Sequence, residues 1–272
     1  MSGLKLVCIS YVRLLLAAAA LAVGPAYADI ELSDPSMIDK VNTTSPLPKG
    51  FVVGAVGLGY TPRYPDSQAR TSYVIPGFIY LGDKVVYLGD RARYYFHRDG
   101  DFAAFAFGRL RFGSLEAEDA PTFVGIKKRR AELELGIGAN WVTPYALLTT
   151  RISTDVTGAS GGQEAMVWAD FPLVRKDFVV MPGVGLMLRS ANLANYYFGG
   201  ISAEEAIPGR PAHDVGNSLS VVGSVFSAYR INAKWVLMAT VAYEHYAPGI
   251  RSSPLIKHSG ELTGLAGLGY VW

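Results

Sequence analysis

The chain of 272 residues contains a single cysteine, Cys8, which lies near its start. The remainder of the sequence therefore has no means of forming an internal disulfide or a zinc site built on thiolates. Its histidines, His97, His213, His245 and His258, are far apart and show no metal-ligand spacing. We accordingly expect no metal centre and no cofactor.

Two further features are missing: a long apolar run and an excess of charge. After residue 28, Gly, Arg, Glu or Pro interrupts every apolar stretch before it reaches the roughly 18 residues that a membrane helix needs. The 25 basic residues, less Lys5 and Arg13 in the first 28, equal the 23 acidic residues, and this balance does not suggest a nucleic-acid partner. Yet 50% of the chain is hydrophobic, so these residues must be organised in some other way.

The N-terminal residues divide into two segments. Residues 1–28 have the form of a secretory signal peptide, with Lys5 and Arg13, an apolar run at 14–23 and a small-residue cleavage site at 26–28. Residues 29–50 are polar, contain three prolines and show no periodicity, which predicts a periplasmic leader. Residues 51–272 then form the folded domain.

This domain is predicted to consist of long β-strands. Residues 130–141, 235–245 and 262–272 alternate strictly between apolar and polar or small side chains, which is the period of a strand with one apolar face. Weaker alternation occupies further segments, so eleven strands are counted in all; the weaker ones are 51–60, 72–81, 85–96, 101–112, 143–153, 163–173, 178–189 and 217–229.

The length of these strands favours a membrane barrel over a soluble sandwich. A tilted strand that crosses a bilayer needs about nine to eleven residues, whereas strands of soluble proteins have about five or six. Aromatic residues stand near the strand ends, among them Phe51, Tyr60, Trp141 and Trp235, as expected for girdles at the two membrane interfaces. Because such barrels have an even number of strands, we predict an all-β antiparallel outer-membrane barrel of about 12 strands, with ten as the alternative. The strand missing from the count of eleven is expected between residues 60 and 112.

Two groups of polar residues are candidates for function. The first is a set of charged side chains on strand faces opposite the apolar ones, which would either filter solutes or pair with one another to close a narrow lumen: Arg109, Arg111, Arg130, Glu132 and Glu134. The internal pairing is favoured for so few strands. The second lies in the longest loop, 190–216, where Ser202 and Glu205 form a capping box that predicts the start of a short helix. Beside it, a loop plug or a recognition surface is predicted from Asn195, Tyr196, Tyr197 and Phe198.

Several stretches resemble the MipA/OmpV family of Gram-negative outer-membrane proteins. They are VGLGYTPRYPDS at 56–67, SYVIPGFIYLGD at 72–83, NYYFGGISAEEA at 195–206, GRPAHDVG at 209–216 and the ending GLGYVW. The resemblance covers about residues 50–272 and implies an outer-membrane β-barrel. One kind of family member is a scaffold that joins a lytic transglycosylase to a peptidoglycan synthase, and others are regarded as porin-like or adhesive.

The ending carries a second resemblance. Gly267, Tyr270 and Trp272 are similar to the carboxy-terminal signal that the barrel assembly machinery recognises, although Leu265 stands where that pattern usually has a polar residue. The implied partners are thus this machinery, together with outer-membrane lipids and lipopolysaccharide.

No arrangement of residues predicts an enzyme. His258 and Ser259 are neighbours in sequence, and adjacent side chains of an extended chain diverge. A pair of His245 with Ser252 or Ser253 would have to form through a loop. We therefore expect a non-enzymatic outer-membrane protein that acts as a scaffold for peptidoglycan-processing enzymes. The alternative is a narrow porin-like channel for small solutes, and a barrel enzyme is the third and least favoured hypothesis.

Overall fold

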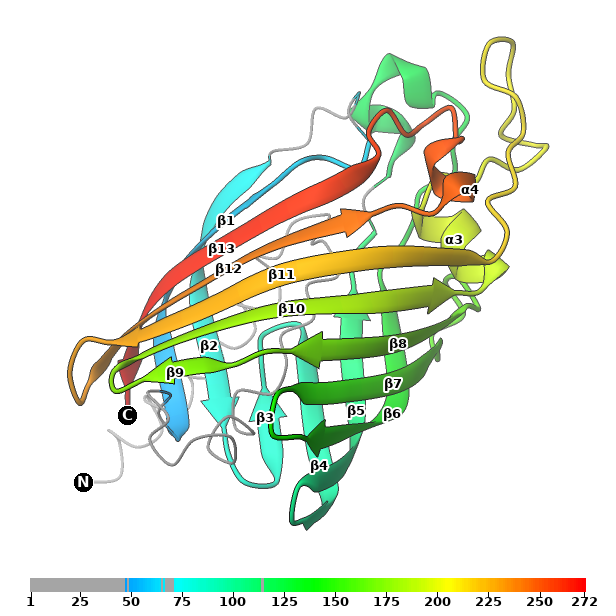
Figure 1. Cartoon of the computed structure of the whole chain (residues 1–272). Helices are drawn as coiled ribbons and strands as arrows, with labels where there is room; N and C mark the ends of the chain where they lie inside the picture. The colour runs from blue at the N-terminus through cyan, green and yellow to red at the C-terminus, as the bar shows by residue number, and fades with distance from the viewer. Residues whose placement is uncertain (1–46, 48, 65, 67–70, 114) are drawn as a thin grey trace, which may run out of the picture.

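A computed structural model describes residues 47, 49–64, 66, 71–113 and 115–272. The expected signal peptide and nearly all of the leader lie outside this part of the chain. The strands wind into a closed antiparallel β-barrel in which the last strand pairs with the first (Figure 1). They are β1 (Gly50–Tyr60), β2 (Ser72–Leu81), β3 (Val85–Tyr87), β4 (Arg91–Asp99), β5 (Phe102–Arg111), β6 (Glu132–Val142), β7 (Leu147–Asp155), β8 (Gln163–Asp170), β9 (Leu173–Arg175), β10 (Phe178–Arg189), β11 (Ser218–Arg230), β12 (Trp235–His245) and β13 (Gly260–Val271).

These elements make a barrel of 12 strands, as predicted. β8 and β9 count as one strand, because both pair with β10 and only Phe171 and Pro172 separate them. The strand absent from the sequence count is β3, since the segment predicted as one strand at 85–96 turns back on itself between β3 and β4. It lies in the predicted interval.

Among the described residues, β3 alone closes the seam between β2 and β4. β2 pairs with β3 only through Tyr80 and Leu81, whereas it pairs with β1 along ten residues. The backbone N–H of Tyr60 donates to the carbonyl of Thr71. Since hydrogen-bonded residues alternate along an antiparallel strand, the backbone N–H and C=O groups of residues 72, 74, 76 and 78 point away from β1. One of these is Pro76, which has no N–H to leave unpaired, in keeping with the position of proline at strand edges.

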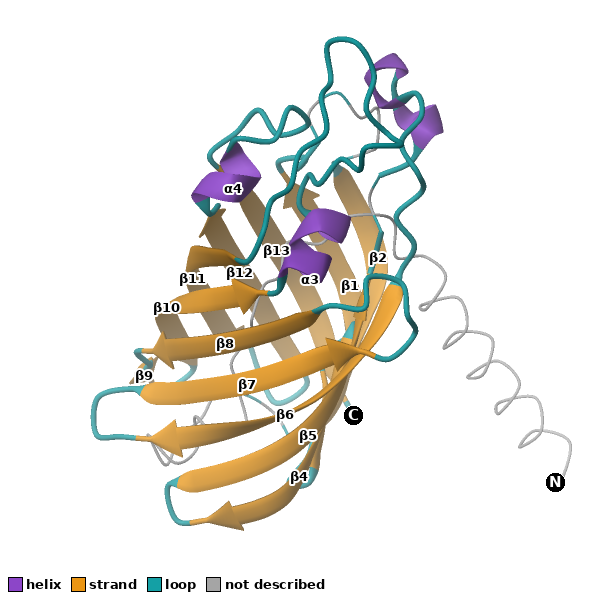
Figure 2. Cartoon of the chain, turned by 90° about the vertical axis from the view of Figure 1, so that its right-hand side faces the viewer, coloured by secondary structure: helices purple, strands orange, loops and turns teal. Residues whose placement is uncertain are grey.

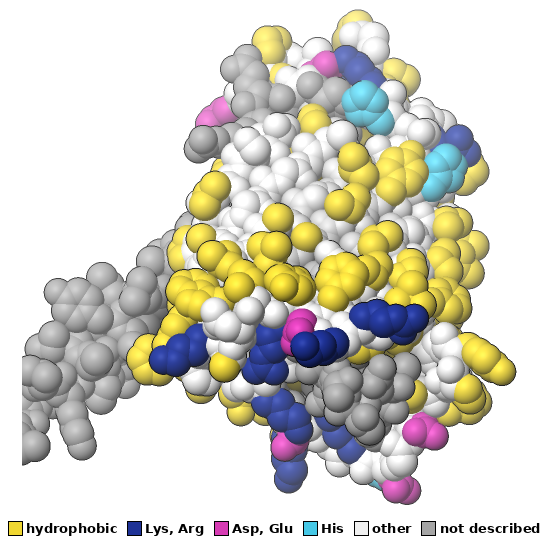
Figure 3. Space-filling model, turned by 60° about the vertical axis from the view of Figure 1, so that its left-hand side comes forward, with side chains coloured by type: hydrophobic (Ala, Val, Ile, Leu, Met, Phe, Trp, Pro, Cys, Tyr) yellow, Lys and Arg dark blue, Asp and Glu magenta, His cyan; other side chains and the backbone are white. Residues whose placement is uncertain are grey.

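The two faces of the barrel wall differ in chemistry. Leu135, Ile137 and Trp141 of β6 point outward and are exposed, whereas Glu132 and Glu134 point inward and are buried. On the face shown in Figure 3, the outward side chains gather into an apolar belt. Tyr60, which the sequence places in a girdle, is instead buried on the inward face, because it shares the parity of inward Val52 and Leu58.

The two ends of the barrel also differ. At one end, which we call the turn end, the strands are joined by short turns, and the C-terminus lies there (Figure 1). At the other end, the loop end, lie the long connections with the helices η2 (Ala117–Asp119), η3 (Pro121–Phe123), α3 (Ala191–Tyr197) and α4 (Pro248–Arg251) (Figure 2). Within the described ranges, no helix is long and apolar enough to cross a membrane.

The long loops pack against one another rather than extend separately. A hydrophobic cluster at the loop end contains buried residues from the connections that follow β1, β5, β10 and β12, including Tyr64, Phe123, Phe198 and Ile250. The loop end therefore has a core of its own.

One described residue of the leader enters the barrel at the turn end. Leu47 is buried against inward-facing side chains of β10 and β11, among them Met181 and Phe226. The chain then turns into β1 at Gly50, whose positive φ of 100° favours glycine.

Candidate functional site

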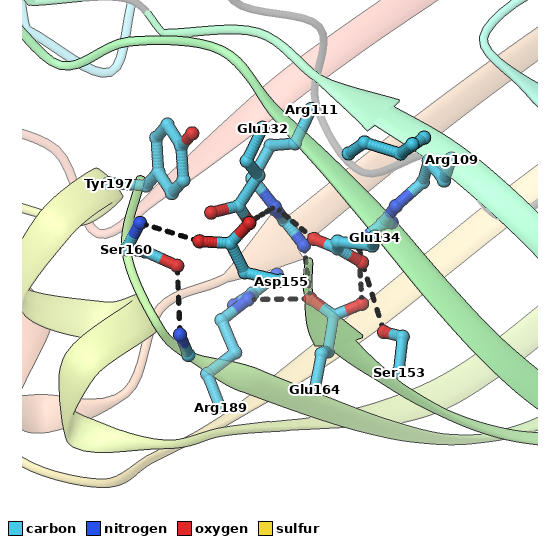
Figure 4. Close-up of polar contacts among 12 residues, drawn as sticks. Arg109, Arg111, Glu132, Glu134, Ser153, Asp155, Ser160, Glu164, Arg189 and Tyr197 are labelled. Atoms are coloured by element: carbon cyan, nitrogen blue, oxygen red, sulfur yellow. Dashed lines mark hydrogen bonds and ion pairs between the residues drawn. The ribbon is translucent and has the colours of Figure 1, made fainter. Parts of the chain in front are cut away.

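The lumen is crossed by a network of buried ion pairs near the loop end (Figure 4). Four arginines and four glutamates contribute, so their formal charges cancel; they are Arg109 and Arg111 of β5, Glu132 and Glu134 of β6, Arg151 of β7, Glu164 of β8, Arg189 of β10 and Glu244 of β12. Each occupies an inward position of its strand, and each is at most 7% exposed.

Glu164 is the centre of this network. Its Oε1 accepts hydrogen bonds from Arg109 at 3.0 Å and from Arg151 at 2.9 Å. Its Oε2 accepts from Arg111 at 2.9 Å and from Arg189 at 3.1 Å. One carboxylate thus connects four arginines from three different strands.

Two other glutamates accept several hydrogen bonds, whereas Glu132 forms an ion pair with Arg111 at 3.4 Å. Glu134 accepts from Arg109 at 2.8 Å, from Arg111 at 2.7 Å and from the hydroxyl of Ser153 at 3.0 Å. On the other side of Glu164, the carboxylate of Glu244 accepts hydrogen bonds from two nitrogens of Arg189, at 2.5 and 3.1 Å. The network therefore extends from β5 to β12.

The energetics of such a network favour one fixed arrangement. Removing charges from water is costly, and the attraction between the ions offsets this cost only where they are paired with good geometry, as around Glu164 and Glu134. Removing one member leaves a buried charge uncompensated, which typically costs about 3–5 kcal/mol. We infer that the network holds the inner faces of these strands in place.

A loop residue covers the network. The ring of Phe198 contacts two guanidinium groups, with the Cζ of Arg63 at 4.1 Å and that of Arg189 at 4.0 Å from its centroid. Arg63 also pairs with Glu261 at 3.0 Å and donates to the carbonyl of Tyr197 at 3.2 Å. The loop at 190–217 therefore folds inward, and Phe198 is fully buried above the lumen.

Tyr246 strengthens this covering layer. Burial is the main reason why the pKa of Tyr246 lies above its usual value. Its hydroxyl thus stays protonated and donates to Oε2 of Glu261 at 2.7 Å.

A second contact fixes the same loop from outside the barrel. Oε1 and Oε2 of Glu205 accept from Arg129 at 2.9 and 3.0 Å. Burial by itself would raise the pKa of Glu205, but hydrogen bonds from Arg129 and from the backbone N–H groups of Ser202 and Lys127 outweigh it and lower the pKa to about 2. We call this contact, between Arg129 and Glu205, the loop clasp.

The predicted helix start at Ser202 is wrong. Glu205 does bond the backbone N–H of Ser202 at 3.0 Å, as in a capping box, but the chain makes a turn there. A bridge between Ile207 and Arg210 reverses the chain before a helix can form. The helix in this loop is α3, which includes Asn195, Tyr196 and Tyr197.

The predicted plug residues take part in holding the loop. Asn195 donates to Asp214 at 2.7 Å and accepts from the backbone of Val215 at 2.8 Å. The hydroxyls of Tyr196 and Tyr197 bond the backbone N–H and carbonyl of Arg130 at 2.8 and 2.6 Å. All of these contacts are internal to the loop end.

The structure divides the predicted lumen-lining residues. Arg109, Arg111, Glu132 and Glu134 meet in the network, but the side chain of Arg130 is exposed. Its prediction as a lumen residue is wrong, because residue 130 precedes β6 and lies outside the barrel wall. Four further members of the network were not predicted. They alternate with apolar residues on predicted strands, so the period of two could have identified them: Arg151, Glu164, Arg189 and Glu244.

The C-terminal residues lie at the turn end. Trp272 is 83% exposed, its N–H donates to Phe51 at 2.9 Å, and the ring of Tyr270 lies between those of Trp235 and Trp272 at 5.2 and 6.3 Å. Gly267 faces inward on β13. Among the described residues, no group of His, Cys, Asp or Glu could hold a metal ion.

Comparison with known proteins places this barrel among outer-membrane proteins. The chain is 25% identical over 229 residues to the MltA-interacting protein of Escherichia coli, covering 82% of this chain and 89% of that protein. It is 24% identical over 146 residues to the outer membrane protein Omp26La of Vibrio anguillarum, covering 54% of this chain and little more than half, 56%, of that relative. A solved structure, the translocator domain of the autotransporter NalP from Neisseria meningitidis, has a TM-score of 0.42 and 12% identity, covering 88% of this chain and 93% of that one.

A family model shows where the chain belongs. The model for the MltA-interacting protein MipA matches residues 53–272, which is the whole barrel apart from the first residues of β1. With its relatives, the protein is located in the outer membrane. The chain is a member of the MipA family.

Proposed function

We propose that this protein is a non-enzymatic scaffold of the outer membrane that binds a lytic transglycosylase at its periplasmic end. The observation that carries the proposal is the network around Glu164 with Phe198 above it, because an interior held by ion pairs suits a rigid anchor better than an open pore. The relative in Escherichia coli bears the name MltA-interacting protein, which supports the same choice.

The turn end offers a surface for such a partner. It faces the periplasm if both ends of the barrel domain lie on that side, as is general for these barrels. Among the described residues of this end, basic ones exceed acidic ones: Lys49, Lys84, Arg98, Arg175, Lys176, Arg230 and Lys234 against Asp83, Asp99, Asp101 and Asp177. Lys and Arg side chains form a row directly beneath the apolar belt in Figure 3. This row would attract an acidic partner, and it also suits anionic lipid headgroups.

A pull-down tests the scaffold. We expect the purified barrel to retain a lytic transglycosylase from envelope extract, and the double variant Arg175→Glu, Lys176→Glu to lose it because the turn end changes sign. The matched control is Lys128→Glu with Arg130→Glu, which makes the same charge change at the loop end. Absence of any lytic transglycosylase on the unmodified protein would refute the proposal.

The same pull-down tests whether the leader contributes to binding. Leu47 packs inside the turn end and Lys49 pairs with Asp83 at 3.1 Å, so the described end of the leader lies beside the proposed docking surface. A chain without residues 29–46 shows whether the leader takes part in binding. Equal retention with and without these residues would assign binding to the barrel turns alone.

A narrow channel is the second candidate. The observation that favours it is the inward face of β2, where Tyr73, Ile75 and Ile79 are only partly buried, so side chains do not fill the lumen there completely. In planar bilayers, a scaffold should give no stable single-channel steps. Steps that change in size with Arg111→Ala, but not with the exposed Arg130→Ala, would favour the channel.

A further inference from the structure

A groove of about 840 Å³ lies on the outer face of the barrel, across β6, β7, β8, β10 and β11. Its floor consists of outward apolar side chains, each between 48% and 58% exposed: Leu135, Ile137, Ile152, Leu188 and Leu219. A volume of this size is in the range of small-molecule sites, about 300–1,000 Å³. The network described above lies directly behind it, since Glu164 precedes the lining residue Ala165 on β8 and Arg189 follows Leu188 on β10.

The position of the groove restricts its occupant to a lipid. Its floor residues occupy the outward, exposed positions of their strands, and such positions face hydrocarbon in an outer-membrane barrel. A depression in this surface is filled by acyl chains, because an empty space would forfeit their dispersion contacts.

The rim of the groove indicates which leaflet supplies the lipid. Gln163, Ser190 and Asn217 line it, and they stand where β8, β10 and β11 meet the loop end. Because the loop end faces away from the periplasm, the groove opens in the outer leaflet, whose lipid is lipopolysaccharide. The rim groups are neutral hydroxyls and amides, which can hydrogen-bond the hydroxyl and amide groups of a glucosamine backbone.

The rim is also held in place by the protein. The backbone N–H of Gln163 donates to the hydroxyl of Ser190 at 2.9 Å, and the N–H of Ala191 donates to the side-chain carbonyl of Asn217 at 2.8 Å. Ala191 is the first residue of α3, so the rim is continuous with the loop that covers the lumen. We propose that this groove is a specific binding site for one acyl chain of lipopolysaccharide, with the sugar backbone at the rim. The proposal rests on the fold and location of the protein and does not depend on the scaffold function.

Native mass spectrometry of the full-length barrel in mild detergent tests the site. The probes are Kdo2-lipid A and, separately, phosphatidylethanolamine. We expect a persistent one-to-one complex with the first and none above the level of nonspecific binding with the second. Ile152→Trp fills the groove and should weaken Kdo2-lipid A binding about ten-fold, which corresponds to the loss of roughly two buried methylene groups.

The matched control is Val225→Trp, which enlarges an outward residue of β11 that does not line the groove. It should bind as the unmodified protein does. If Ile152→Trp fails to fold, as judged by migration on unheated gels, Leu135→Trp makes the same test from the neighbouring strand. The proposal would be overturned if the protein retained both lipids equally. It would also be overturned if Ile152→Trp and Val225→Trp weakened Kdo2-lipid A binding to the same extent.

Discussion

At the scale of single residues, Glu164 is the side chain on which most others depend. It is 2% exposed and bonds Arg109, Arg111, Arg151 and Arg189. Glu164→Gln keeps the size but removes the charge, so the buried arginines lose their common counter-ion. We expect the free energy of unfolding to fall by about 3–5 kcal/mol, measured by urea titration of the barrel in micelles.

The exposed pair of Lys128 and Glu116, at 2.7 Å, provides a control for this variant. Glu116→Gln removes the same charge at the surface and should cost less than about 1 kcal/mol. Similar losses for the two variants would show that the network does not hold the barrel together.

Trp272 carries a prediction about assembly. Its exposed ring contacts little of the protein besides the ring of Tyr270, so deleting it should change the stability of the folded barrel only modestly. If the ending is read by the barrel assembly machinery, however, the deletion should lower the amount of folded protein in the outer membrane severalfold. Undiminished levels in fractionated membranes would contradict this role.

At the scale of elements, the loop clasp predicts a dependence on pH. Because the pKa of Glu205 is lowered to about 2 from an ordinary value of 4.5, the clasp contributes its full stability above about pH 4.5 and loses it as the pH falls toward 2. Protection of residues 190–217 from an acid-tolerant protease should therefore be constant above about pH 4.5 and decrease as the pH falls from there toward 2.

Glu205→Gln provides the comparison, because it cannot ionise and leaves Arg129 without its counter-ion. The loop of this variant should be cleaved faster at neutral pH, and the difference from the unmodified protein should narrow as the pH falls. A variant that is as well protected as the unmodified chain at pH 7 would exclude the clasp as a fixing contact.

The seam at β2 predicts unequal hydrogen exchange. The backbone N–H groups of Val74 and Phe78 point away from β1, and within the described residues β3 pairs with β2 only at Tyr80 and Leu81. In contrast, β12 is paired along both edges. Exchange in micelles should thus be faster at Val74 and Phe78 than at outward residues of β12 such as Val241. Equal protection would mean that the seam is closed by other contacts.

At the scale of the whole molecule, a closed barrel should survive mild detergent. Every strand is paired on both sides over at least part of its length, and such closure is disrupted only by disrupting many backbone hydrogen bonds together. The unheated protein is expected to migrate differently from the boiled protein on a denaturing gel. Identical migration would contradict a closed barrel.

Much of this fold could be predicted because the alternation of side chains is local information. The strict period in β6, β12 and β13 fixed which residues face lipid, and all three strands have that orientation. The division of 85–96 into β3 and β4 could not be predicted in this way. The turn between them contains Leu88 and Gly89, and glycine also occurs within many of the continuous strands of this barrel, so it gives no distinct turn signal. Tyr60 was assigned to the wrong face because an aromatic at a strand end suits either one.

The sequence by itself determined the barrel, its apolar belt and the polarity of its interior, because a strand exposes its alternate residues wherever it is placed. Only the tertiary structure decided that Glu164 meets four arginines, that Arg130 stays outside the lumen and that Phe198 covers it. Such contacts join residues from strands and loops far apart in the chain. They depend on how the barrel closes and how its loops fold back, and no local pattern of side chains encodes either.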